Sequence, residues 1–222
     1  MSALLQQALS LYSPLPAAER FHVHARASSA PLLAVASRMP GGTVADIGCG
    51  HGLLSALLAL ASPGRTVHGV DPDPRKVAWA LQALAGLPNV RLEEGTVEAM
   101  LATSLRGACD GATVCDVLYL LPEEKWDGFL RSVHGLLKPG GRFLLKEVEG
   151  DGSWKHRKAL AQEWVMVSLL GRTKASGGMV LLPREEMRRR LSAAGFDVRE
   201  VVELGRGYTT PHILYMAEAR VP

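Results

Sequence analysis

The sequence has few cysteines and aromatic residues and no long hydrophobic run. Three of its 222 residues are cysteine, and aromatic residues make up 5%. Cys49, Cys109 and Cys115 show no CxxC spacing, which argues against a zinc site or a disulfide framework and favours small buried side chains. No segment reaches the roughly 18 apolar residues of a membrane-spanning helix, and the N-terminus lacks a signal-peptide pattern. We therefore expect a soluble cytoplasmic protein without a bound metal.

Strong charge of either sign is also missing. The formal net charge is +3 and the pI is near 8.9, far below the Lys/Arg density of proteins that bind nucleic acid through its phosphates. With 47% hydrophobic and 21% charged residues, the composition is that of an ordinary globular domain. We expect a monomer or homodimer with no nucleic-acid partner.

From residue 43 onward, short apolar segments typical of strands alternate with segments that have helical periodicity. Such alternation indicates βαβ units, and hence a mostly parallel sheet covered by helices on both faces. The predicted strands are Thr43–Ile47, Thr66–Val70, Val90–Glu93, Gly111–Val117 and Arg142–Val148. The predicted helices between them are His51–Ser62, Pro74–Ala85, Val97–Arg106 and Glu123–Leu137.

Segments on either side of this core break the alternation. A helix is predicted over residues 2–12, and a second is expected to begin at an N-cap provided by Ser28 or Ser29 and to run through Met39. A long helix over Trp154–Leu170 and a glycine-rich stretch over residues 171–178 form an insertion. The remaining predicted elements are a helix over Arg184–Ala194 and a final antiparallel hairpin of Asp197–Leu204 and His212–Ala219.

These segments predict an α/β fold with a Rossmann-like, seven-stranded, mostly parallel sheet, a C-terminal antiparallel hairpin and a helical cap. The expected organisation is a helical cap, a cofactor-binding core, an insertion over the substrate site, and a helix with an edge hairpin that completes the core. Their boundaries are residues 1–40, 41–149, 150–182 and 183–222.

A glycine-rich motif, Asp46–Gly52, lies at the turn from the first predicted strand to the next helix. Glycines allow a ligand to approach the backbone closely, and the next helix presents free N–H groups. The dinucleotide pattern G-x-G-x-x-G does not fit, because Gly48, Gly50 and Gly52 are evenly spaced and Leu53 occupies the third glycine's place. This spacing disfavours NAD.

Two further motifs follow at suitable distances. Asp71 ends the second predicted strand, where an acid can accept hydrogen bonds from ribose hydroxyls. The segment Leu136–Leu145, LLKPGGRFLL, contains the turn before the fifth predicted strand and the start of that strand. Together with the glycine turn, these motifs resemble those of class I S-adenosylmethionine-dependent methyltransferases over residues 44–148. The resemblance implies S-adenosyl-L-methionine as cofactor and S-adenosyl-L-homocysteine as product.

The resemblance also implies a set of cofactor-binding residues. The family often has an aspartate after the third strand that holds the adenine amino group, whereas this chain has Thr96. We expect Thr96 and the Val97 N–H to contact adenine, with Glu98 as a possible substitute acid. The implied cofactor-binding residues are Asp46, Gly48, Cys49, Gly50, Gly52, Asp71, Pro72, Thr96, Val97 and Asp116.

Methyl transfer needs an acceptor atom about 3 Å from the methyl carbon and, for an O–H or N–H group, a nearby base. Candidate residues of the reaction chamber are Tyr119, His156 and His212. His51 lies inside the glycine turn, where a role in the cofactor site or in loop structure is favoured. For Asp116, anchoring of its loop is favoured over catalysis.

The predicted function is therefore methyl transfer to an O, N or C atom of a small molecule. Cationic residues before the core, Arg20 to Arg26, and in the insertion, Lys155 to Arg157, favour an acidic or phosphorylated acceptor. The alternatives are an RNA or protein methyltransferase, or a non-catalytic protein of the same fold that binds an adenosine cofactor.

Overall fold

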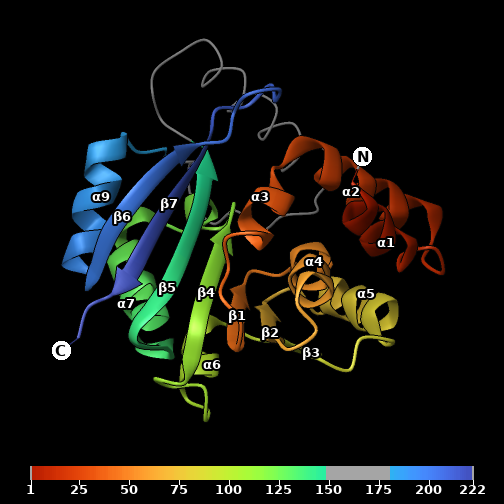
Figure 1. The fold of residues 1–222 in the computed structure, drawn as a ribbon, viewed down its shortest axis with the longest axis horizontal. Helices are drawn as coiled ribbons and strands as arrows, with labels where there is room; N and C mark the ends of the chain where they lie inside the picture. The colour runs from red at the N-terminus through yellow and green to blue at the C-terminus, as the bar shows by residue number, and fades with distance from the viewer. Residues whose placement is uncertain (1, 149–180, 222) are drawn as a thin grey trace.

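A computed structural model describes residues 2–148 and 181–221. In this part of the chain, seven strands form one sheet in the order β3-β2-β1-β4-β5-β7-β6 (Figure 1). The strands are β1 Thr43–Ile47, β2 Thr66–Asp71, β3 Val90–Glu94, β4 Cys109–Cys115, β5 Leu137–Val148, β6 Phe196–Glu203 and β7 His212–Ala219.

The first five strands pair in parallel, whereas β7 pairs antiparallel with both β5 and β6. This arrangement confirms the predicted Rossmann-like sheet and its terminal hairpin. The strand order reverses between β1 and β4, because the chain adds β2 and β3 on one side of β1 and continues with β4 on the other. Ligands of such sheets bind beyond the carboxyl ends of the strands at this reversal.

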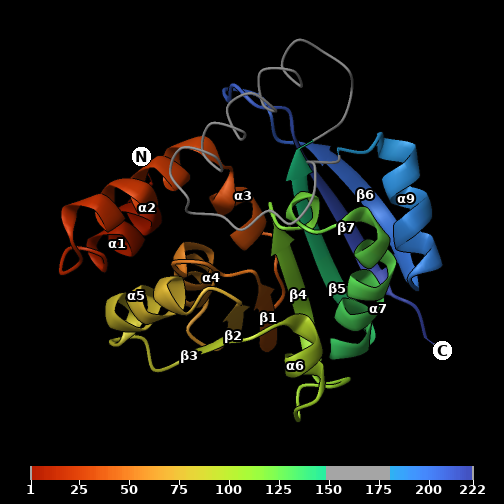
Figure 2. The same ribbon diagram turned by 180° about the vertical axis from the view of Figure 1, so that it is seen from behind.

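Two groups of helices cover the two faces of the sheet (Figure 2). Helices α1 to α5 pack in one hydrophobic cluster with Leu144 of β5, and helices α6, α7 and α9 pack in another with its neighbours Phe143 and Leu145. Alternate side chains of a strand thus enter opposite cores. The helices are α1 Ala3–Ser10, α2 Ala17–Ser29, α3 Leu32–Ala36, α4 Leu53–Ala61, α5 Pro74–Leu84, α6 Val97–Leu101, α7 Trp126–Leu136 and α9 Arg184–Ala193, with short 3-10 helices η1 Leu118–Leu120 and η2 Glu123–Lys125.

The prediction for the segment before the core was wrong in one respect. Ser28 and Ser29 do not cap the start of a helix through Met39; they are the last residues of α2, and α3 begins after Pro31. Their hydroxyls donate to the carbonyl oxygens of His24 and Arg26 within the last turn of α2. Serine suits either helix end, because its hydroxyl can bond to nearby backbone groups in both settings.

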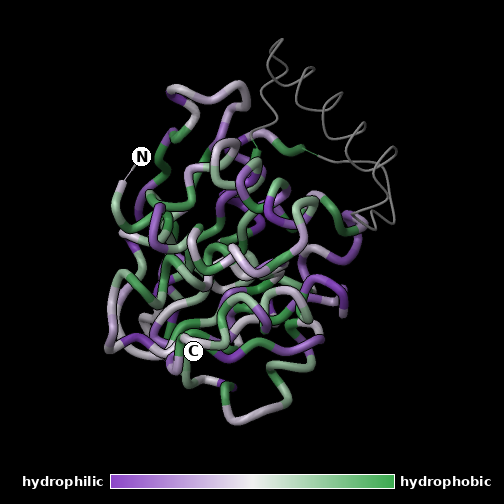
Figure 3. The backbone as a smooth tube through the Cα atoms, turned by 90° about the vertical axis from the view of Figure 1, so that its right-hand side faces the viewer, coloured by the Kyte–Doolittle hydropathy of each residue, from purple (hydrophilic) through white to green (hydrophobic). Residues whose placement is uncertain are grey.

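The predicted helix over residues 154–170 and the glycine-rich stretch after it lie outside the described residues. Within the described part, no helix has the length and apolar character needed to cross a membrane. Figure 3 shows hydrophobic and hydrophilic stretches alternating along the described chain.

Candidate functional site

The three glycines of the turn after β1 all adopt left-handed backbone conformations, with φ between 55° and 76°. A Cβ at Gly48 would lie 2.3 Å from Val117 Cγ2, and one at Gly52 would lie 2.9 Å from Leu84 Cδ1. These two glycines therefore permit tight packing against the neighbouring elements. At Gly50 the nearest atom within 4 Å is Asp71 Oδ2, at 3.9 Å. Gly50 is thus the point where the turn leaves space for a ligand.

Asp71 lies at the carboxyl end of β2, directly beside this turn. Its Oδ2 accepts a hydrogen bond from the Gly50 N–H and its Oδ1 accepts one from the Asp73 N–H, each at 2.9 Å. A carboxylate has about four acceptor positions, so each oxygen retains one. Two acceptors at fixed spacing match the two hydroxyls of a ribose.

Asp46 and Cys49 point into the protein instead. The Ser55 hydroxyl of α4 donates to Asp46 Oδ2 at 2.6 Å, and burial raises the pKa of this carboxyl to about 6 against the opposing effect of that bond. The Cys49 side chain packs against Gly69, and burial raises the pKa of its thiol. Both residues therefore shape the turn. Pro72, another predicted cofactor-binding residue, follows Asp71 and is exposed.

Helix α6 begins next to Asp71, where the adenine contact is expected. Thr96 is its N-cap, and its hydroxyl accepts the Ala99 N–H at 3.4 Å. The Val97 side chain is buried, and its N–H belongs to the first helical turn, whose N–H groups have no partner within the helix. Glu98, in the same turn, is exposed.

Helix α2 and the turn that precedes it contact the glycine turn from outside. The Tyr12 hydroxyl donates to the His51 carbonyl oxygen, and the His51 Nε2 lies 2.8 Å from Glu19 Oε2. The His22 ring packs on the His51 ring with 4.8 Å between centroids. These contacts favour the structural interpretation of His51.

Asp116 follows β4 and has a left-handed backbone, with φ of 57°. Its carboxylate lies 2.6 Å from both Arg26 Nη1 and Lys146 Nζ. Burial raises the pKa of Asp116, but the charges of Lys146 and Arg26 outweigh this effect and hold it well below the usual range. Asp116 therefore anchors its loop to α2 and β5, and its predicted cofactor contact stays a prediction.

His212, at the start of β7, is buried on the same face of the sheet. Its Nε2 lies 2.8 Å from the Ser29 carbonyl oxygen, which only accepts, so Nε2 carries the ring proton. Burial and the Lys146 charge lower the pKa of His212 to about 4, so the ring is neutral near pH 7. Nδ1 is then an acceptor, and it has no hydrogen-bond partner among the described residues.

The other cationic residues before the core do not converge on this place. Arg20 and His24 are exposed and border a surface hollow between α1 and α2, whereas Arg26 pairs with Asp116. The expected catalytic residue His156 and its cationic neighbours Lys155 and Arg157 lie outside the described part of the chain.

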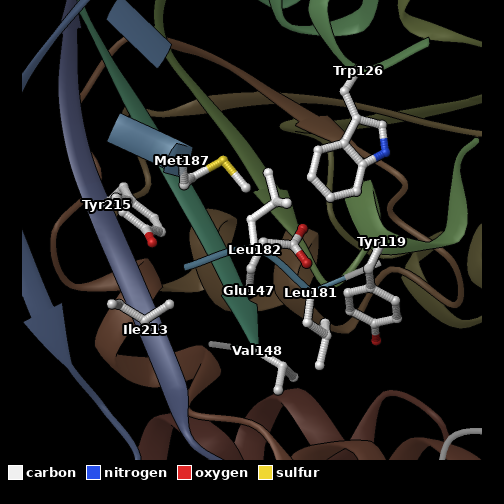
Figure 4. Close-up of a pocket in the computed structure, with 9 residues that line it drawn as sticks. All are labelled: Tyr119, Trp126, Glu147, Val148, Leu181, Leu182, Met187, Ile213 and Tyr215. Atoms are coloured by element: carbon white, nitrogen blue, oxygen red, sulfur yellow. The ribbon is translucent and has the colours of Figure 1, made fainter. Parts of the chain in front are cut away.

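Tyr119, in η1, borders a small cavity on the opposite face of the sheet (Figure 4). Trp126, Met187 and Ile213 contribute apolar walls, and Glu147 of β5 contributes a carboxyl group. Sequence reasoning missed Glu147. The available signal was a pair of adjacent charged residues, Lys146 and Glu147, at the end of an otherwise apolar strand.

Glu147 is buried, with 4% of its surface exposed. Its Oε1 accepts the Leu118 N–H at 3.0 Å and the Val117 N–H at 3.3 Å. Its Oε2 has no hydrogen-bond partner among the described residues. Burial and the negative charge of Asp116 raise the pKa of Glu147 to about 8.

Comparisons with known proteins agree with this architecture. A family model described as a methyltransferase domain matches residues 19–201. The chain is 29% identical over 179 residues to a ubiquinone biosynthesis O-methyltransferase of Pseudomonas paraeruginosa, covering 78% of this chain and 72% of that protein. It is 37% identical over 108 residues to the Xanthomonas campestris enzyme of the same name, covering 48% and 43%.

Solved structures show the same fold. A putative methyltransferase in complex with the Haloferax volcanii Trm112 activator has a TM-score of 0.67 at 18% identity, with coverage of 85% of this chain and 88% of that one. An O-methyltransferase family protein from Burkholderia thailandensis has a TM-score of 0.67 at 20% identity, with coverage of 86% and 55%. The match over residues 19–201 includes both the glycine turn and Asp71. The chain therefore belongs to the methyltransferase-domain family and is a class I, S-adenosylmethionine-dependent methyltransferase.

Proposed function

We propose that this enzyme binds S-adenosylmethionine at the turn after β1 and methylates a hydroxyl oxygen of a small molecule. The observation that carries the cofactor assignment is the position of Asp71 beside Gly50, with one free acceptor position on each carboxylate oxygen. When bound, the cofactor supplies an electrophilic methyl group on a sulfonium. The choice of oxygen is supported by the relatives named ubiquinone biosynthesis O-methyltransferase.

Each end of the proposed cofactor site has its own residues. Asp71 accepts the ribose hydroxyls, and the first turn of α6, with Thr96 and Val97, faces the adenine. Gly50 admits the methionine end close to the backbone. Asp46 acts indirectly by fixing the start of α4 through Ser55.

The proposal extends to the surrounding segments. Residues 1–40 act as a cap, supported by the contacts of Tyr12 and Glu19 with the glycine turn. Residues 150–182 are assigned to the acceptor side, and residues 183–222 to completion of the sheet. A cytoplasmic location belongs to the same proposal.

Calorimetric titration tests the cofactor assignment. S-adenosylhomocysteine should bind with micromolar or tighter affinity, and NAD should not compete. Incubation with methyl-labelled S-adenosylmethionine and catechol should then place the label in a methyl ether. Binding of NAD in place of S-adenosylhomocysteine would refute the proposal, and transfer of the label to RNA or protein instead of small phenols would favour the alternative acceptors.

A further inference from the structure

Four polar side chains gather where three neighbouring strands and helix α2 meet. Asp116 follows β4, Lys146 lies near the end of β5 and His212 begins β7, and these strands are adjacent in the sheet. His212 pairs with Val148, two residues beyond Lys146 on β5, so His212 and Lys146 project from the same face. Arg26 of α2 completes the group by its contact with Asp116. We refer to Arg26, Asp116, Lys146 and His212 as the edge cluster.

The edge cluster has more positive than negative charge. Arg26 and Lys146 are cations, and both contact the Asp116 carboxylate. Burial lowers the pKa of Lys146, but the contact of its Nζ with both Asp116 oxygens, each 2.6 Å away, opposes this effect. His212 is neutral near pH 7 and adds no charge. The cluster therefore lacks one negative charge, and buried charge without a counterion is unfavourable.

Two further carboxyl groups lie close enough to influence these charges, but neither pairs with a cation of the cluster. Asp46 accepts the Ser55 hydroxyl, and Glu147, on the opposite face of the sheet, accepts backbone N–H groups. A pKa of about 8 also keeps Glu147 largely protonated near pH 7. The missing negative charge is therefore best supplied by a ligand.

Arg26 is the member of the cluster that a ligand can reach. Its side chain is 33% exposed, whereas that of Asp116 is 5% exposed. Its Nη1 contacts Asp116 and its Nη2 donates to the Cys115 carbonyl oxygen at 3.4 Å, which leaves three of the five guanidinium N–H groups. The planar guanidinium matches a carboxylate in shape. A carboxylate also brings the single charge that the cluster lacks, whereas a phosphate group brings up to about two.

His212 adds a second requirement. Its Nδ1 has no hydrogen-bond partner among the described residues, although the side chain is buried, with 5% of the residue exposed. Because Nε2 carries the ring proton, Nδ1 can only accept, so the group that meets it has to be a donor. The nearby charges of Arg26 and Lys146 disfavour an ammonium donor and favour a neutral hydroxyl. A pKa of about 4 makes this nitrogen a weak base, which suits binding rather than proton removal.

We propose that the edge cluster binds the methyl acceptor and that the acceptor is a hydroxy acid. Arg26 pairs with its carboxylate, and His212 Nδ1 accepts a hydrogen bond from its hydroxyl group. Asp116 holds the two cations of the cluster in place, and Lys146 contributes charge. This inference rests on the proposed function, because it names the class of acceptor for the same reaction.

The experiment compares acids with their neutral amides. Protein saturated with S-adenosylhomocysteine is titrated at pH 7 with 2-, 3- and 4-hydroxybenzoate and with the corresponding hydroxybenzamides. The three isomers sample different spacings between the carboxylate and the hydroxyl. At least one acid should bind at least tenfold more tightly than its amide, because a hydrogen bond to an ionised group is about twice as strong as a neutral one. The same acid should bind more tightly than benzoate, which lacks the hydroxyl.

Variants assign the two preferences to their residues. In Arg26→Met the preferred acid and its amide should bind about equally, and in His212→Phe the acid should lose its advantage over benzoate. The matched control Arg20→Met, at an exposed position on the same helix, should keep both preferences. A general loss of structure would weaken the paired ligands alike, so the ratio of affinities is the informative quantity. A ratio of acid to amide that persists in Arg26→Met would overturn the proposal.

The wild type alone also tests the proposal, without dependence on the folding of a variant. If no hydroxybenzoate binds more tightly than its amide, the proposal is wrong. Weaker binding of S-adenosylhomocysteine to Arg26→Met with an unchanged ratio of acid to amide would also overturn it, because Arg26 would then serve the carboxylate of the cofactor. Failure of S-adenosylhomocysteine to bind the wild type would instead refute the cofactor assignment, and the acid and amide titrations without it would still test the edge cluster.

Discussion

Arg26 of α2 and Asp116 at the end of β4 form an ion pair, with 2.6 Å between Nη1 and Oδ2. The two residues are 90 positions apart, and their contact ties the N-terminal helices to the carboxyl edge of the sheet. Because Lys146 contacts the same carboxylate, Asp116 pairs with two cationic side chains at once.

Replacement of Arg26 by Met should lower the free energy of unfolding by about 1–2 kcal/mol. Loss of one partner of a buried pair costs about 3–5 kcal/mol, but Arg26 is about one-third exposed and Lys146 still pairs with Asp116. Urea denaturation measures the change. Arg20→Met, at an exposed position on the same helix, should stay within about 0.5 kcal/mol of the wild type. Equal effects of the two variants would contradict a special role for the Arg26 pair.

Replacement of Asp71 by Ala should weaken binding of S-adenosylhomocysteine at least tenfold. The variant loses the hydrogen bonds from the ribose hydroxyls to the Asp71 carboxylate, and a hydrogen bond to a charged group is worth about 1.5–3 kcal/mol. Isothermal titration calorimetry measures the affinity. Asp110→Ala is the matched control, because Asp110 also accepts a backbone N–H, that of Thr43, but lies near the amino end of β4. Unchanged affinity in Asp71→Ala would refute the ribose assignment.

Replacement of Gly48 by Ala should destabilise the protein by at least about 2 kcal/mol. The left-handed backbone costs roughly 1–2 kcal/mol for a residue with a Cβ, and the new atom meets Val117 Cγ2. Adding Val117→Ala removes that clash, so the double variant should lose less stability than the sum of the single losses. Thermal melts measure the stability of each variant. Gly41→Ala is the control and should be nearly neutral, because a Cβ there meets nothing within 4 Å.

The stability of the wild type should fall more steeply with pH than that of Glu147→Gln between about pH 6.5 and 8. Glu147 has a pKa of about 8 in the folded protein and an ordinary value of 4.5 when unfolded, so in this range the folded state binds the extra proton. One such group contributes a slope of at most about 1.4 kcal/mol per pH unit, with stability lost as pH rises. Urea denaturation at three pH values measures both slopes, and identical slopes would contradict the raised pKa.

The lower limit of that window is set by His212. Its pKa of about 4 in the folded protein lies below the ordinary 6.5, so it acts in the opposite sense, with stability lost as pH falls below about 6.5. Above that value His212 is neutral in both states and no longer obscures the contribution of Glu147.

The parts of the fold that local patterns determine were predictable from the sequence. The strands of the core and the turn around Gly48 were placed within a few residues, because apolar periodicity and glycine spacing are local signals. Helix α2 was missed, because its segment, AAERFHVHARASS, is largely polar and Ser28 and Ser29 fit either end of a helix. The place of Asp71 at the carboxyl end of β2 was predicted because it follows a short apolar strand pattern.

The charged residues at the carboxyl ends of β4 and β5 were less predictable, because they meet their partners only in the folded chain. The Arg26–Asp116 pair joins segments that share no sequence pattern, and Arg26 was expected in a cationic cluster that the structure separates. Glu147 at the end of β5 gives no motif. Its burial follows from the packing of Trp126 and Met187, which no periodicity of β5 reveals.

The alternation of side chains along β5 makes one strand the partition between two chemically different compartments. Lys146 faces the ion pairs beneath α2, and Glu147 faces the apolar cavity beneath α7 and α9. Pairing with β4 and β7 fixes this assignment. A shift of the β5 register by one residue would exchange the side chains that face the two compartments. It would place the Lys146 ammonium in the cavity and the Glu147 carboxyl beside Asp116. An insertion or deletion within β5 should thus be far more damaging to the enzyme than most point substitutions there.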